Sequence, residues 1–116
     1  MRFINLTTHV IRIHRNGTQI IEFPPSGVVA RVSQAPSELV NELAGVPIGV
    51  PGAFGQVEGV PSPQEGVGLI VSGLLGARFE NSGRRDIFVP ATGPKDGVIR
   101  GNDGQIVAVA MLNQIS

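Results

Sequence analysis

Cationic side chains gather between residues 83 and 100 of this chain, namely Arg84, Arg85, Lys95 and Arg100. Guanidinium groups bind carboxylates and phosphates through planar, bidentate contacts. Thr92 and Gly93 lie in the same segment, where backbone N–H groups can form a nest for an anion. The chemistry that this segment favours is capture of a small anionic ligand. The alternatives are pairing of the arginines with acidic side chains and an ordinary turn at Thr92-Gly93.

Arg84, Arg85 and Asp86 follow one another directly before an apolar run that predicts a strand. Adjacent side chains of an extended chain point to opposite faces, so Arg84 shares a face with Asp86 and Arg85 does not. We therefore expect Arg84 to pair with Asp86, and Arg85 to contact the ligand.

A second polar group lies near the N-terminus, where Asn5, Thr7, Thr8 and His9 separate two apolar runs. Such side chains either bond their own backbone at a corner of the chain or read the polar edge of a ligand. Ser72 follows a buried apolar run and is added to the candidate site. The complete set of expected ligand contacts is Asn5, Thr7, His9, Ser72, Arg84, Arg85, Thr92, Gly93, Lys95 and Arg100.

Catalytic and cofactor motifs receive little support. Ser72, His9 and Asp86 can be combined into a triad on paper, but no Gly-x-Ser-x-Gly elbow supports it. The two histidines, His9 and His14, face opposite sides of an extended segment and there is no cysteine, so no metal is expected. Neither a P-loop nor a dinucleotide fingerprint is present. We expect a protein without catalytic activity or cofactor.

Composition sets the expected partners. Charged residues make up only 16% of the chain and hydrophobic residues 41%, with a formal net charge of zero. So few charges leave apolar surface to be covered by another subunit, and a homo-oligomer is expected. The neutral charge argues against binding to nucleic acid polymers. No apolar run approaches the ~18 residues of a membrane span, so a cytoplasmic protein is expected.

The elements that must position these residues are short strands. Asn16-Gly17 predicts a type I′ turn that joins strands over residues 10–15 and 18–23. Further strands are expected over 3–6, 28–32, 53–57, 86–89 and, as central strands apolar on both faces, 67–72 and 105–112. A helical turn is expected over 73–79.

Residues 36–44 predict a short helix, because Leu39 and Leu43 are four apart and Pro36 and Gly45 suit its ends. Residues 45–66, rich in proline and glycine, are expected to be a mobile loop or an oligomer arm. Together these elements predict one domain over residues 1–116. It is mainly β, a small barrel or sandwich of seven or eight short strands with one or two short helices.

The opening Ile4-Asn5-Leu6-Thr7-Thr8-His9 resembles the Asn-Leu-Thr-Pro-His start of a group of small bacteriophage and prophage accessory proteins. Residues 69–72, 84–90 and 104–109 are similar to the rest of that group, whereas 36–66 are not, and Thr8 stands where the group has proline. The resemblance implies a phage product in the bacterial cytoplasm and no particular reaction. The expected function is capture of a nucleotide-like anion or blocking of a host defence protein. A minor virion or assembly protein is the alternative, and a small hydrolase using His9 and Asp86 is a third.

Overall fold

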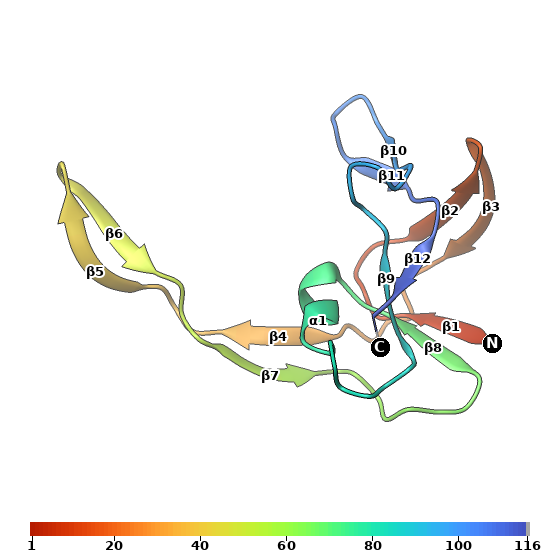
Figure 1. The fold of residues 1–116 in the computed structure, drawn as a ribbon, viewed down its shortest axis with the longest axis horizontal. Helices are drawn as coiled ribbons and strands as arrows, with labels where there is room; N and C mark the ends of the chain where they lie inside the picture. The colour runs from red at the N-terminus through yellow and green to blue at the C-terminus, as the bar shows by residue number, and fades with distance from the viewer. Residues whose placement is uncertain (116) are drawn as a thin grey trace.

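Strands dominate residues 1–115, the part of the chain that the computed structural model describes (Figure 1). The N-terminal strands are β1 (Arg2–Asn5), β2 (Ile11–Arg15), β3 (Thr18–Phe23), β4 (Arg31–Gln34), β5 (Glu38–Leu43), β6 (Val46–Val50) and β7 (Phe54–Glu58). The remaining elements are β8 (Val67–Ile70), α1 (Gly73–Ala77), β9 (Ile87–Pro90), β10 (Ile99–Arg100), β11 (Ile106–Ala108) and β12 (Leu112–Gln114). The predicted mainly β class is confirmed, with more strands than the seven or eight expected.

The largest sheet has the strand order β1-β8-β9-β12. Strand β8 lies between β1 and β9 and is parallel to both, while β12 is antiparallel to β9. Leu69 and Ile70 are buried, as expected of a strand that is apolar on both faces. The central strand predicted over 67–72 is confirmed for residues 67–70, and the chain then leads into α1. The sheet is open, because β1 and β12 form its two edges.

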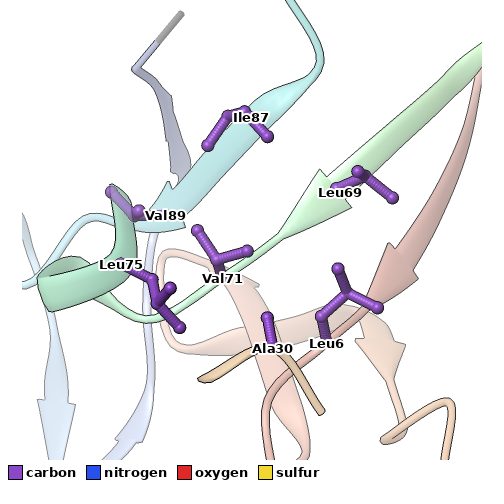
Figure 2. Packing of buried hydrophobic residues seen from close by; sticks show 7 residues of the cluster. All are labelled: Leu6, Ala30, Leu69, Val71, Leu75, Ile87 and Val89. Carbon is purple, nitrogen blue, oxygen red and sulfur yellow. The ribbon is translucent and has the colours of Figure 1, made fainter. Parts of the chain in front are cut away.

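The core is small and aliphatic. Figure 2 shows its seven clustered side chains, which are Leu6, Ala30, Leu69, Val71, Leu75, Ile87 and Val89. Helix α1 packs close to β9, and a Cβ atom added at Gly76 would lie 2.4 Å from Cγ1 of Val89. Ser72 caps the helix, because its Oγ accepts a hydrogen bond from the backbone N–H of Leu75 at 3.4 Å. The predicted helical turn is therefore confirmed, and Gly76 provides the close approach.

The hairpin of β2 and β3 has the predicted turn. Asn16 and Gly17 adopt φ values of 52° and 85°, the left-handed pair that a type I′ turn requires. Residues 105–112, by contrast, do not form one central strand. They divide between β11, which pairs with β10, and β12 at the sheet edge, and Ile106 and Val107 are exposed. Apolar content alone did not reveal that these residues belong to two separate strands.

An arm of residues 31–58 projects from the body (Figure 1). The chain runs outward along β4 and β5, turns at Ala44-Gly45, and returns along β6 and β7. The helix predicted over 36–44 is wrong, since these residues form β5 and its turn. A spacing of four residues places Leu39 and Leu43 on one face of a helix but also suits the two-residue period of a strand.

The root of the arm is held by the body, whereas its tip is not. Val32 and Val57 pack against the core cluster. Arg78, just after α1, donates a hydrogen bond to the carbonyl of Gly55 at 3.1 Å and lies over the ring of Phe54. Strands β5 and β6 pair only with each other among the described strands. The radius of gyration is 17.1 Å, against ~13 Å for a compact domain of about 100 residues.

Candidate functional site

The polar corner between β1 and β2 is organised by Asn5, which is only 2% exposed. Its Nδ2 donates to the carbonyl oxygens of His9 at 2.7 Å and Phe23 at 2.9 Å. Its Oδ1 accepts from the backbone N–H of Thr7 at 2.9 Å and from the Thr7 hydroxyl at 2.7 Å. All four hydrogen-bonding positions of the amide are thus used within the protein. This arrangement favours the structural interpretation of the corner.

Arg84 is also held by the protein. Its guanidinium binds Asp86 through Nε at 2.9 Å and Nη2 at 2.7 Å, and Nη2 also donates to the carbonyl of Pro61 at 2.9 Å. The same group lies over the ring of Phe79, 5.5 Å from its centroid. The predicted Arg84–Asp86 pair is confirmed. Arg85 is exposed and lines a shallow hollow of about 320 Å³ together with Met1 and Glu65.

The turn at Gly93, after β9, already contains an anionic group, the carboxylate of Asp96. The backbone N–H of Gly93 donates to Oδ2 of Asp96 at 2.7 Å, so a carboxylate of the same turn binds this N–H group. Arg100 donates through Nη1 to the carbonyl of Gly104 at 2.8 Å, within the β10–β11 connection. Lys95 is exposed. The assignment of these residues as ligand contacts stays a prediction.

Besides the residues of the polar corner, two expected contacts from distant parts of the sequence line the same groove. His9 and Thr92 line a groove of about 510 Å³ beside β2 and β11, together with Arg12 and Gln105. Arg12 is exposed, and it is the cation of this groove that sequence reasoning missed. Its position on β2, close in sequence to His9, was the available signal. The ten expected contacts are therefore spread over several places and do not form one pocket.

Another groove is apolar and was not anticipated from the sequence. It measures about 790 Å³. We call it the Phe/Pro groove, after lining residues that include Phe3, Phe23, Pro24, Pro25, Val28, Val60 and Pro61. The rings of Phe3 and Phe23 meet edge to face with their centroids 5.5 Å apart. These residues come from separate segments of the chain, so sequence spacing gave no sign of the groove.

The arm carries the second notable surface. Large apolar side chains are exposed along β5, β6 and the start of β7, and Leu39 is the most exposed of them at 70%. The set comprises Leu39, Val40, Leu43, Val46, Val50 and Phe54. A two-stranded hairpin is marginal by itself in water and is stabilised by packing of an apolar face. Exposed apolar clusters of this kind mark interaction surfaces.

Known proteins provide no guide to these surfaces, since no protein-family model, no curated protein and no solved structure matches this chain. Residues 1–115 contain no group of three or more His, Cys, Asp or Glu side chains placed to hold a metal ion. The single helix described in that range is too short to cross a membrane.

Proposed function

We propose that this protein is a non-enzymatic assembly component that associates with copies of itself through its arm. The observation that carries the proposal is the exposure of six large apolar side chains on an arm whose tip has no support from its own body. Apolar surface is removed from water at a gain of roughly 25 cal/mol per Å². A partner that covers the arm therefore supplies stabilisation that the monomer lacks.

Charge supports the same proposal. The arm carries Arg31 against Glu38, Glu42 and Glu58, whereas the rest of the chain carries the other eight basic and six acidic residues. The arm is thus net acidic and the body net basic. Opposite charges on the two parts favour association of one copy's arm with another copy's body over contact between two arms.

Light scattering on an arm-shortened variant tests the proposal. Residues 35–53 are replaced by Asn-Gly, which joins Gln34 to its cross-strand neighbour Phe54. We expect a multiple of 12.1 kDa for the wild type and a folded monomer for the shortened chain. A wild-type mass of 12.1 kDa at micromolar concentration, or an unchanged oligomer after shortening, would overturn the proposal.

A second candidate function is capture of a small anionic ligand in the groove lined by His9, Arg12 and Thr92. The supporting observation is that Arg12, which lies opposite Glu22 in the β2–β3 hairpin, forms no salt bridge among residues 1–115. A thermal-shift screen with nucleotides, repeated on Arg12→Ala, tests this candidate. Arg85→Ala tests the ligand contact expected from the sequence in the same assay, because loss of a charge-assisted contact lowers affinity by about 1.5–3 kcal/mol. Binding that neither substitution weakens would contradict both assignments.

The bacteriophage origin and the bacterial cytoplasm belong to this proposal as implications of the resemblance in the N-terminal and C-terminal segments. Blocking of a host defence protein stays within it as a further use of the same exposed arm. The expected barrel or sandwich would form between copies, because the two-stranded sheets can gain further strands from a neighbouring chain.

A further inference from the structure

We infer that the Phe/Pro groove of one copy receives the tip of the β5–β6 hairpin from a second copy. This inference rests on the proposed function and names the surface that the arm meets. The groove is an open apolar surface of the body, and the arm tip is an exposed apolar surface of the arm. A volume of about 790 Å³ falls within the ~300–1,000 Å³ of ligand-sized pockets and can accept a few aliphatic side chains.

The shape of the tip suits insertion into a groove. Leu43 and Val46 are cross-strand partners on either side of the Ala44-Gly45 turn, so their side chains project from the same face at the end of the arm. Both are more than half exposed. A narrow hairpin end with two adjacent aliphatic side chains can enter a groove whose walls are phenylalanine and proline.

The occupant must come from another molecule. Val60 and Pro61 follow β7 directly, so the groove lies at the root of the arm. Figure 1 shows the tip at the opposite end of the arm from this root. The arm consists of the β4–β7 and β5–β6 ladders, joined by residues 35–37 and 51–53, and this arrangement holds the tip away from its own groove.

Charge at the groove favours the arm over a neutral peptide. Arg2 is exposed at the lining of the groove, and its side chain makes no ion pair within the described residues. Glu42 lies beside Leu43 on β5 and is exposed. The Glu42 side chain points to the opposite face of β5 from Leu43, so this carboxylate contributes to the net acidic charge that attracts the arm towards Arg2 and not to the inserted face.

Each copy offers one tip and one groove, and these are different surfaces. The contact is therefore heterologous unless two copies exchange arms reciprocally. Reciprocal exchange gives a closed dimer, whereas one-way docking gives a ring or a filament. In each case the tip is covered by a groove.

Disulfide cross-linking tests this docking, because the natural chain has no cysteine. A Leu43→Cys variant is mixed with a Val28→Cys variant and oxidised, and the linked peptides are identified by mass spectrometry. Val28 lines the groove and is about half exposed. The control is Ile20→Cys, which has similar exposure on β3 outside the groove. We expect at least tenfold more product linking positions 43 and 28 than positions 43 and 20.

Light scattering on the same samples distinguishes failure of the tip-in-groove docking from failure of arm-mediated assembly. An oligomer in which position 43 links equally to positions 28 and 20, or to neither, would overturn the docking and leave arm-mediated assembly standing. A monomeric protein would overturn both. An oligomer with selective linkage between 43 and 28 supports the docking.

Discussion

Arg84 and Arg85 are neighbours in the sequence but lie in different surroundings. The Arg84 side chain is 19% exposed and forms a bidentate pair with Asp86, whose side chain is 10% exposed. Arg85 is exposed, and its backbone carbonyl accepts a hydrogen bond from Nε2 of Gln114 at 2.8 Å. Residues 84–86 precede β9 and bend at Arg85, so the Arg84–Asp86 pair that the two-residue period predicted forms outside a regular strand.

Arg84→Ala should lower the free energy of unfolding by about 2–4 kcal/mol, because it leaves the largely buried Asp86 carboxylate without its partner. Arg85→Ala should change it by less than ~0.5 kcal/mol, as is usual for an exposed site. Urea denaturation of both variants checks this. Adding Asp86→Asn to Arg84→Ala should recover part of the loss, and equal effects of the two arginine substitutions would contradict the prediction.

At the scale of elements, two hairpins use the same turn geometry with different residues. Asn16-Gly17 has the preferred type I′ sequence, whereas the arm turns at Ala44-Gly45, and Ala44 adopts a φ of 51°. A left-handed alanine is unfavourable by roughly 1–2 kcal/mol. The arm tip is therefore held in a strained turn by the pairing of β5 with β6.

Ala44→Asn should stabilise the hairpin, because asparagine tolerates the left-handed region and Asn-Gly favours type I′ turns. The expected result is up to about tenfold slower amide exchange in β5 and β6, equivalent to ~1.4 kcal/mol. Amide exchange followed by NMR measures it on the arm and the body separately. Ala44→Val is the matched control with the opposite expected effect. It should accelerate amide exchange in β5 and β6, because β-branched side chains disfavour the left-handed conformation.

Helix α1 contains two glycines with different surroundings. A Cβ at Gly73 would meet nothing within 4 Å, whereas a Cβ at Gly76 would overlap Val89. Gly76→Ala should therefore destabilise the protein by about 1–3 kcal/mol through overpacking. Gly73→Ala should be neutral or stabilising by up to ~1 kcal/mol.

Thermal denaturation of the two alanine variants provides the comparison. Combining Gly76→Ala with Val89→Ala should cost less than the sum of the separate changes, because the smaller side chain makes room for the added methyl group. Equal destabilisation by Gly73→Ala and Gly76→Ala would show that the contact with Val89 is not the cause.

The sequence predicts those elements whose signals are local. The signals are local for the Asn16-Gly17 turn, the central strand of residues 67–70 and the Arg84–Asp86 pair. An arm was among the expectations for residues 45–66, but strand β6 was missed because Pro47 and Pro51 hide the alternation of Val46, Ile48 and Val50. An edge strand tolerates proline, so proline content did not exclude a strand there. The Phe/Pro groove depends on distant segments and had no local signal.

At the scale of the whole molecule, the body holds the core and the arm holds much of the exposed apolar surface. The core cluster uses residues before position 31 and after position 68, with Val32 and Val57 of the arm root packed against it. Stability of the body and association through the arm can therefore be altered independently.

Hydrogen exchange at two protein concentrations tests this separation. In dilute samples, amides of residues 38–50 should exchange fastest among the strands, because no core packing protects them. In concentrated samples the same amides should become protected, while those of β8 should not change. If amides of residues 38–50 exchange as slowly as those of β8 in a monomeric sample, the prediction is contradicted. The same experiment tests the mobility expected from the sequence for residues 45–66.

The parallel pairing of β1 with β8 has a consequence for biosynthesis. Arg2 lies opposite Val67, so β1 has no partner strand in this sheet until β8 has been synthesised. Hairpins close within ~1–10 μs, while contacts between distant residues are slow to form. The apolar arm is therefore complete before the sheet that carries its proposed receptor groove. With the proposed docking, a completed arm can contact grooves on finished chains, and contacts between unfinished copies are then a route to misassembly.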